Sequence, residues 1–452
     1  MSISPQGCRP ETSILELGDG FYDPVSAADF PQTVLRFRND RAAAEVGLDK
    51  VSDADWLRYF GRFEPLPGSL EQPLALRYHG HQFRNYNPEI GDGRGFLFAQ
   101  LRDERGRLMD LGTKGSGTTP WSRFGDGRLT LKGGMREVLA TEMLQALGVN
   151  TSRTFSLIET GEALERGDEP SPTRSAVMVR LSHGHIRIGT FQRLAYLRDA
   201  EAMERLVGYV LRNLYGEEPE ADAPVRLLDL VVDRTATLAA SYMAAGFVHG
   251  VLNTDNINVT GESFDYGPWR FAPTWDPAFT AAYFDHAGLY AFGRQPEAIH
   301  WNATQLAISL RALVEAEPLI AVLDTFAERY QSAVSAAILW RLGVVPRDAT
   351  SDRALVQAIE RGLRTSGMAI DRFYFDAFGG VALEGEPFDE LRAALEPYAP
   401  RKTRDHAYWQ GDPCAMLIDE VEAIWAAIDQ RDDWAPFDAK IAQIRNMGEA
   451  LA

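Results

Sequence analysis

The stretch that decides the fold of this chain is GFVHGVLNTDNINVTGESFDYGPW, residues 246–269. Its glycines, polar residues and short apolar runs predict a helix end, a loop, a short strand, a turn and a second short strand. Asp255 and Asn256 lie in the loop, and Asp265 follows nine residues after Asn256. Carboxylate and amide oxygens suit a hard cation. We expect residues 257–259 to form the strand that lets Asn256 and Asp265 converge on one metal ion.

Phosphotransferases of the protein-kinase type hold Mg²⁺ with an Asn of the catalytic loop and an Asp of a following turn. Their catalytic base is an Asp that lies five residues before that Asn. Here this position is Val251, which cannot accept a proton, and Asp255 is the nearby carboxylate on the loop. An Asn- and Asp-rich hairpin that turns at Gly261 is the alternative interpretation. The flanking His-Gly and Tyr-Gly pairs favour a metal site at Asn256 and Asp265.

The composition limits the classes of function. The chain has 452 residues, enough for two or three packed units, with a net charge of −18 and a pI of about 5.0. This acidity argues against general nucleic-acid binding and against adhesion to an anionic membrane, but it allows a local basic cleft for nucleotide phosphates. Two cysteines, Cys8 and Cys414, and the lack of an 18-residue apolar run predict a soluble protein of the reducing cytoplasm.

The order of patterns along the chain predicts three parts. Residues 1–73 are expected to form an N-terminal extension, in which residues 27–48 carry a helix. Residues 74–192 are rich in glycine and short apolar runs, which predict a strand-rich lobe with one helix at 135–147. Within this lobe, strands at 155–158 and 176–181 flank a polar insertion at 160–174. Residues 193–452 are dominated by helical periodicity, and a helix at 227–245 leads into the opening stretch.

Two turns with the same sequence are candidates for phosphate binding. Gly-Asp-Gly-Arg occurs at 91–94 and again at 125–128. Glycines let backbone N–H groups approach phosphates, and an arginine adds charge. An ordinary tight turn is the alternative for each copy. The sequence contains no G-x-x-x-x-G-K-[ST], so it does not encode a P-loop.

A lysine at a predicted strand end is a third candidate. Lys114 precedes Gly-Ser-Gly, and a lysine in such a place can reach phosphates when a helix glutamate holds it. Glu137 faces away from the apolar stripe of the 135–147 helix, whereas Glu142 falls within it. The spacing favours Glu137 as the partner and leaves Glu142 open.

Arg180 and Arg187 lie seven residues apart around a predicted strand end. Planar guanidinium groups suit phosphate clamping, and two surface arginines are the alternative. His183 and His185 lie between them without further ligands nearby in the sequence, so we assign no zinc site.

Together these motifs resemble the selenoprotein O (SelO, YdiU) family of protein adenylyltransferases, over residues 74–310. The resemblance rests on ordered motifs with consistent spacing. They are Tyr78-His79-Gly80-His81-Gln82-Phe83, Gly91-Asp92-Gly93-Arg94, Lys114-Gly115-Ser116-Gly117, Thr119-Pro120-Trp121-Ser122-Arg123, Gly125-Asp126-Gly127-Arg128, Arg136-Glu137, His185-Ile186-Arg187, Asn253-Thr254-Asp255-Asn256, Asp265-Tyr266-Gly267-Pro268, Tyr290-Ala291-Phe292, Gln295-Pro296 and Trp301-Asn302.

The resemblance implies an α+β, protein-kinase-like (pseudokinase) fold with a strand-rich N-lobe and a helical C-lobe that carries extra C-terminal helices. It also implies that ATP binds end over end and that AMP is transferred to Ser, Thr or Tyr hydroxyls of proteins, with Mg²⁺ or Mn²⁺. By resemblance Lys114 and Glu137 form an ion pair, Asp255 is the base, and Asn256 and Asp265 bind metal. The implied nucleotide-binding residues are Gly91, Gly93, Arg94, Lys114, Asp126, Gly127, Arg180, Arg187 and Asp265.

Other functions remain open at the level of sequence. The first is a kinase for small molecules or proteins that uses the γ-phosphate, and the second is a non-catalytic scaffold that binds ATP. Retention of Asp255, Asn256 and Asp265 argues against the scaffold. Transfer of UMP is a variant of the adenylyltransferase interpretation. No nucleic-acid or membrane partner is expected.

Overall fold

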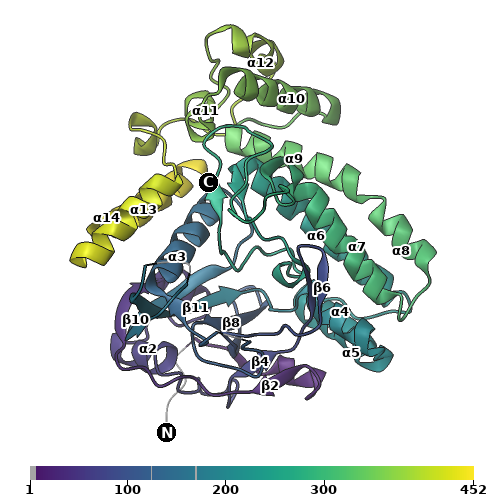
Figure 1. The fold of residues 1–452 in the computed structure, drawn as a ribbon. Helices are drawn as coiled ribbons and strands as arrows, with labels where there is room; N and C mark the ends of the chain where they lie inside the picture. Colours follow the sequence, from purple (N-terminus) through teal and green to yellow (C-terminus); the bar gives the residue numbers. More distant parts are fainter. Residues whose placement is uncertain (1–6, 124, 168–169) are drawn as a thin grey trace.

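The computed structural model of the chain describes residues 7–123, 125–167 and 170–452. Its N-terminal part forms a large antiparallel sheet and its C-terminal part is mainly helical (Figure 1). The expected mixture of an antiparallel sheet and many helices is therefore confirmed. Residues 1–6 of the predicted extension and residues 168–169 of the predicted insertion lie outside the described residues.

The large sheet takes strands from both the 1–73 and the 74–192 segments. In pairing order its strands are β2 (Tyr22–Pro24), β4 (Leu74–Leu76), β7 (Leu97–Arg102), β8 (Leu108–Lys114), β11 (Thr173–Ser182), β10 (Arg153–Leu164) and β3 (Val34–Arg38). Two short strands lie off this path, β1 (Pro10–Glu11) on β7 and β9 (Leu129–Thr130) on β11. The 1–73 segment thus supplies β1, β2 and β3, and its helix α2 (Asp53–Phe60) begins at the cap residue Ser52.

The helix expected at 27–48 is wrong over most of its length. The segment holds β3, which pairs with β10, and only a short helix, α1 (Asp40–Glu45). Residues 34–38 read Val-Leu-Arg-Phe-Arg, and the two arginines alternate with Leu35 and Phe37, which is a period of two. Asn39 ends the strand pattern because its side chain accepts from Ala42 N and so caps α1.

The polar insertion expected at 160–174 is shorter than predicted. Strand β10 continues to Leu164 and β11 already begins at Thr173, so both ends of the segment extend the strands of a hairpin. Thr160 and Ser175 are polar residues within the two strands, and their side chains share a hydrogen bond across the hairpin. Hydrophobic periodicity does not identify a strand segment made of polar residues, so the end of β10 and the start of β11 were predicted at the wrong residues.

The predicted helix at 135–147 exists as α3 (Leu131–Ala146), and it packs on β10 and β11. Thr130 caps it by accepting from Gly133 N. The expected apolar stripe is buried, and its residues are Met135, Val138, Leu139, Met143 and Leu147. The C-terminal helices α13 (Ile418–Arg431) and α14 (Ala435–Leu451) pack on α3 and return the end of the chain to the sheet-bearing part (Figure 1).

The helical part is arranged around α6 (Ala223–Ala245), which packs against α7 (Gln295–Leu310), α8 (Ala316–Leu323) and α9 (Phe326–Leu342). Its other helices are α4 (Ile188–Leu197), α5 (Ala200–Val210) with a π-turn at Leu211–Tyr215, α10 (Ala349–Ser366), α11 (Ile370–Ala377) and α12 (Asp389–Leu395). Within the described residues, no helix has the length and apolar character that crossing a membrane requires.

The 246–269 stretch follows α6 directly, because Gly246 adopts a left-handed conformation (φ 68°) that ends the helix. The stretch contains β12 (Phe247–Val248), which pairs with β13 (Arg270–Phe271), and a single 3-10 turn at Thr254–Asn256. The strand expected at 257–259 is wrong, because Asn258 makes only an isolated bridge with Arg187. A strand there would need a continuous partner, which the neighbouring chain does not offer.

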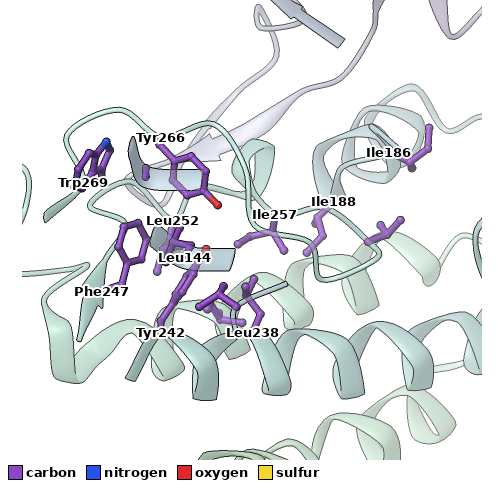
Figure 2. Packing of buried hydrophobic residues seen from close by; sticks show 14 of the residues in the cluster. Leu144, Ile186, Ile188, Leu238, Tyr242, Phe247, Leu252, Ile257, Tyr266 and Trp269 are labelled. Carbon is purple, nitrogen blue, oxygen red and sulfur yellow. The ribbon is translucent and has the colours of Figure 1, made fainter. Parts of the chain in front are cut away.

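Buried apolar side chains of the 246–269 stretch pack against neighbouring segments. Figure 2 shows Phe247, Leu252, Ile257, Tyr266 and Trp269 of the stretch together with residues from three neighbouring segments. These are Leu144 of α3, Leu238 and Tyr242 of α6, and Ile186 and Ile188 around the start of α4. The polar loop residues therefore lie next to a close-packed hydrophobic cluster, which includes residues of both the sheet-bearing part and the helical part.

Candidate active site

A cavity of about 620 Å³ lies where the ends of β8 and β11 meet the 246–269 stretch. Most of the residues that the sequence predicts for the site line it. They are Gly91, Gly93, Arg94, Lys114, Asp126, Gly127, Arg180, Arg187, Asp255 and Asp265. Glu137 and Asn256 do not line the cavity. Glu137 lies behind Lys114, and Asn256 lies beside Asp255 in the loop turn.

Lys114 is the last residue of β8, and its ammonium group contacts the carboxylate of Glu137 on α3. Both side chains are buried, with relative exposures of 4% and 2%. Glu142 has a different partner: it accepts two hydrogen bonds of 2.8 Å from Arg445 of α14 and one from Asn39. Of the two glutamates that the spacing left open, Glu137 therefore holds Lys114, and Glu142 ties α14 to α3.

The carboxylate of Asp265 lies close to two cationic side chains, one from β8 and one from β11. Its Oδ1 lies 2.7 Å from Lys114 Nζ and 3.6 Å from a guanidinium nitrogen of Arg180. Burial alone would raise the pKa of Asp265, but Lys114, Arg180 and Arg94 together hold it well below its usual range. The residue is left-handed (φ 62°), a conformation that is uncommon outside glycine and concentrates at functional sites. Asp265 is thus a fixed anion at the cavity wall.

Arg187 joins the first glycine turn to the loop of Asp255. It donates to Asp92 Oδ1 at 3.0 Å and to the backbone carbonyl of Asp255 at 3.0 Å. Its guanidinium lies over the ring of Tyr78 at 4.3 Å. Such a buried guanidinium is oriented by stacking and hydrogen bonds, so its remaining donors point in fixed directions.

Asp255 is a buried carboxylate with one oxygen free. It is 7% exposed, and its Oδ1 has no hydrogen-bond partner within the described chain. Burial raises its pKa to about 6, and the nearby Arg187 only partly offsets this rise. A carboxylate whose pKa is close to neutral pH suits proton transfer. Gly80 leaves room for it, because a Cβ there would lie 2.8 Å from Oδ1.

The loop and the turn are held together by His249. Its Nε2 donates to the Phe264 carbonyl at 3.0 Å, so its Nδ1 is the acceptor for Val251 N at 3.4 Å. Burial lowers the pKa of His249, which agrees with a neutral imidazole. Asn256 Nδ2 donates to the Val251 carbonyl at 3.0 Å, which leaves the side-chain oxygen of Asn256 free of that contact.

The glycines of the two turns allow close packing of the cavity wall. A Cβ at Gly91 would lie 2.5 Å from the indole of Trp121. Gly127 is left-handed (φ 70°), and a Cβ there would lie 2.2 Å from the backbone of Gly117. Ser122 and Thr119 bond to carbonyls of the first turn, so the 119–122 segment covers it. The two turns thus form one wall.

Several residues of the wall were not predicted as site residues. Asp92 orients Arg187, and Tyr78, Trp121, Arg123, Arg128 and Arg166 also line the cavity. The motifs contained a signal for five of them. Asp92 and Arg128 lie in the two Gly-Asp-Gly-Arg turns, Tyr78 in Tyr-His-Gly-His-Gln-Phe, and Trp121 and Arg123 in Thr-Pro-Trp-Ser-Arg. Arg166 comes from the β10–β11 hairpin and pairs with Asp126 at 2.9 Å, a contact between residues 40 positions apart.

The donor set at the cavity fits a hard divalent cation. The carboxylates of Asp255 and Asp265 line the cavity, the amide oxygen of Asn256 lies in the same loop turn as Asp255, and all of these are oxygen ligands. Within the described residues, Asp255 Oδ1 is a buried acceptor without a hydrogen-bond partner. Among the described residues, no three His, Cys, Asp or Glu side chains form a ligand cluster. Mg²⁺ tolerates this, because it is commonly bound by one or two carboxylates together with substrate phosphates and water.

Comparisons with known proteins show which family this chain resembles over most of its length. The family model for "Protein adenylyltransferase SelO" matches residues 7–380. The protein nucleotidyltransferase YdiU of Synechococcus elongatus is 43% identical over 98% of this chain and 96% of its own. The YdiU protein of Synechocystis is 42% identical over 96% of this chain and 98% of its own. That of Gloeobacter violaceus is 44% identical over 96% and 94%.

The chain is therefore an enzyme of the nucleotidyltransferase class. It belongs to the SelO family, whose model covers most of its length and whose YdiU members align with nearly all of it.

Proposed function

We propose that this enzyme transfers AMP from ATP to Ser, Thr or Tyr hydroxyls of proteins, with Mg²⁺ or Mn²⁺ as cofactor. One observation carries the proposal. The cavity collects arginines and Lys114 on the sheet side and the carboxylates Asp255 and Asp265 on the loop side, while Val251 occupies the usual place of a kinase base. The name of the matching family model supports AMP as the transferred group.

The proposal includes a protein-kinase-like, two-lobed arrangement. Residues 74–192 would form the nucleotide-binding lobe and residues 193–452 the helical lobe with the catalytic and metal loops. Two features support it. An ion pair joins a strand-end lysine to a glutamate on the next helix, and an Asp in a left-handed turn faces the same lysine.

The orientation of ATP follows from the distribution of charge. Arg94, Arg180, Arg187 and the turn at Asp126 supply more cationic and backbone donors on the sheet side than a single glycine loop would. That surplus suits a triphosphate whose tail lies deep against the sheet. The α-phosphate would then lie toward Asp255 and Asp265.

The reaction is a substitution at the α-phosphorus. The protein hydroxyl oxygen attacks phosphorus, pyrophosphate leaves, and the hydroxyl proton passes to Asp255, whose raised pKa and free Oδ1 suit an acceptor. Arg180 and Arg187 neutralise phosphate oxygens. Asn256 and Asp265 would hold the metal, which supplies positive charge for the α-phosphate and the leaving pyrophosphate.

The decisive experiment follows the label. The protein is incubated with Mg²⁺ or Mn²⁺ and ATP labelled at the α- or the γ-phosphorus, with itself and a cell lysate as acceptors. The proposal requires α-label on protein and release of pyrophosphate. Label from the γ-position alone would make the protein a kinase, and tight ATP binding with transfer of neither label would make it a scaffold. The same assay with UTP decides whether UMP is also transferred.

We also propose a cytoplasmic location. The two cysteines, Cys8 and Cys414, are both free, as is common where thiols are kept reduced. Fractionation of cells that produce the tagged full-length chain tests this location, and recovery in a membrane or secreted fraction would reject it.

A further inference from the structure

A second cavity, of about 540 Å³, shares no lining residue with the first among the residues that the structure describes. Its walls come from the β7–β8 turn, the π-turn after α5, the middle of α6 and the turn at Thr260-Gly261. It therefore lies where the sheet-bearing part meets the helical part, and it includes two residues of the 246–269 stretch. The volume falls in the range of small-molecule sites, about 300–1,000 Å³.

The lining of this second cavity is strongly basic. Five arginines and His183 contribute to it, and the described lining includes no Asp or Glu; the arginines are Arg102, Arg105, Arg107, Arg212 and Arg234. Arg102 and Arg107 pair with Glu11 and Asp103. Within the described chain, Arg105, Arg212 and Arg234 have no carboxylate within ion-pair distance. In a chain of net charge −18, three unpaired arginines around one concavity make a local anion site.

An unpartnered nitrogen in the same cavity also points to a ligand. His183 lines the cavity, and its Nε2 is buried without a hydrogen-bond partner in the described chain. A buried polar atom without a partner is uncommon and is usually met by water, an ion or a ligand. Burial and the neighbouring Arg107 lower the pKa of His183 to about 4, so its imidazole adds a hydrogen-bonding group rather than a charge.

We propose that the second cavity binds a small anion that carries two or more phosphate groups. The unpaired arginines come from three separate elements, the β7–β8 turn, the π-turn after α5 and α6, and a linked pair or triplet of phosphates presents a separate anionic group to each. Guanidinium groups bind phosphate oxygens in a bidentate manner. The hydroxyl of Thr260 offers an additional hydrogen bond, because its oxygen accepts from Glu262 N and its proton stays available. A nucleic acid is disfavoured, because the basic surface is a concavity in an acidic chain.

A ligand in the second cavity would also be linked to the first cavity through residues 258–260. Thr260 lies two residues beyond Asn258, whose side chain donates to the Gly184 carbonyl at 2.7 Å and whose backbone bridges Arg187. Such a ligand would join the β7–β8 turn to α6 and bind only the folded chain. We therefore expect it to raise the temperature of unfolding in proportion to its occupancy.

The probe is inorganic tripolyphosphate, measured by isothermal titration calorimetry in EDTA so that no metal competes for it. Wild-type protein is compared with the double variant R212Q/R234Q, which removes two charges and leaves a shorter, neutral polar side chain at each position. The matched control is R361Q/R364Q on α10, two exposed arginines outside the cavity. A third protein, R94Q/R180Q, weakens binding in the first cavity.

We expect one binding component to weaken by at least about tenfold in R212Q/R234Q and to persist in R361Q/R364Q and R94Q/R180Q. The rise in unfolding temperature with tripolyphosphate should shrink in R212Q/R234Q and stay at the wild-type value in R361Q/R364Q. If the double variant is poorly folded, the single variant R234Q replaces it. Equal isotherms for wild type and R212Q/R234Q, no binding at millimolar tripolyphosphate, or an equal loss in R361Q/R364Q would overturn the proposal.

Discussion

Lys114 Nζ donates to Asp265 Oδ1 at 2.7 Å while it also contacts the carboxylate of Glu137. The two partners are separated from Lys114 by 151 and 23 positions in the sequence. One ammonium group thus joins β8, α3 and the 264–267 turn. Its position depends on both carboxylates. Glu137 is buried and Asp265 is partly buried, and charged contacts shielded from water are stronger than exposed ones.

The pair of Lys114 and Glu137 should act as one unit. Replacing Lys114 by Met or Glu137 by Gln should each slow nucleotide transfer by about 10²-fold, because a fixed cation at the phosphates is lost. The double variant should be little slower than either single variant. Steady-state rates of label incorporation into protein measure all three, and strictly additive losses would contradict the pairing.

Glu142 provides the matched control for that experiment, because it lies on the same helix. E142Q weakens the contact with Arg445 and should lower the free energy of unfolding by about 1–3 kcal/mol. The rate of transfer should stay near the wild-type value, since Glu142 does not contact Lys114. Loss of nucleotide binding in E142Q with unchanged stability would reverse the two assignments.

Asp265→Ala should abolish transfer and leave the chain folded. The variant removes the anion that Lys114 and Arg180 face, so ATP affinity without metal should be equal or higher. Binding by calorimetry with and without Mn²⁺, alongside the transfer rate, tests this. Full activity with unchanged metal dependence would remove Asp265 from the metal site.

Asp255→Asn separates the role of Asp255 as a base from a structural role. General-base loss typically costs about 10²–10⁴-fold in rate, and ATP affinity should be nearly unchanged. The unfolding temperature at pH 8 should be equal or higher, because the buried carboxylate with a free Oδ1 is replaced by a neutral group. A rate equal to that of wild type would show that Asp255 is not the base.

Gly127→Ala tests the packing of the second glycine turn. The left-handed conformation and the 2.2 Å approach to the backbone of Gly117 leave no room for a Cβ. We expect weaker ATP binding and a loss of about 1–3 kcal/mol of stability. Gly125→Ala is the control, because a Cβ there meets nothing within 4 Å. Equal ATP affinities for the two variants would show that the turn does not shape the site.

Glu262→Gln should change how stability depends on pH. Burial raises the pKa of Glu262 from 4.5 to about 7 in the folded chain. Below pH 4.5 the carboxyl is protonated in both states, so the variant and wild type should have similar stability there. As pH rises to 7 the wild type loses up to roughly 3 kcal/mol that the variant keeps. Gln can still accept the 3.0 Å hydrogen bond from His183 N.

Unfolding temperatures between pH 4.5 and 8 check this sign, with E317Q as a control at an exposed position on α8. The difference between E262Q and wild type should grow across that range, whereas E317Q should follow wild type. A constant difference at all pH values would mean that Glu262 does not titrate between the two states.

Local patterns predicted the elements whose signal is local. The apolar stripe predicted α3, and Gly246 predicted the end of α6. The pattern failed at residues 34–38, where pairing with β10 and not helical propensity decides the conformation. It also failed at residues 257–259, whose backbone hydrogen bonds are made with Ile186 and Ile188 and so cannot be assigned from neighbours in the sequence.

For the site, the sequence by itself determined which residue types are present: Asp255 and Asn256 in one loop, Asp265 in a turn, Val251 in place of a base, and two glycine turns. Spacing along one helix could not decide between Glu137 and Glu142. Only the tertiary structure decided it, because the choice depends on α14. Arg445 of that helix pairs with Glu142, although the two residues are 303 positions apart in the sequence. The partner of a charged side chain is set by its neighbours in the folded structure, and local sequence patterns do not identify neighbours that are distant in the sequence.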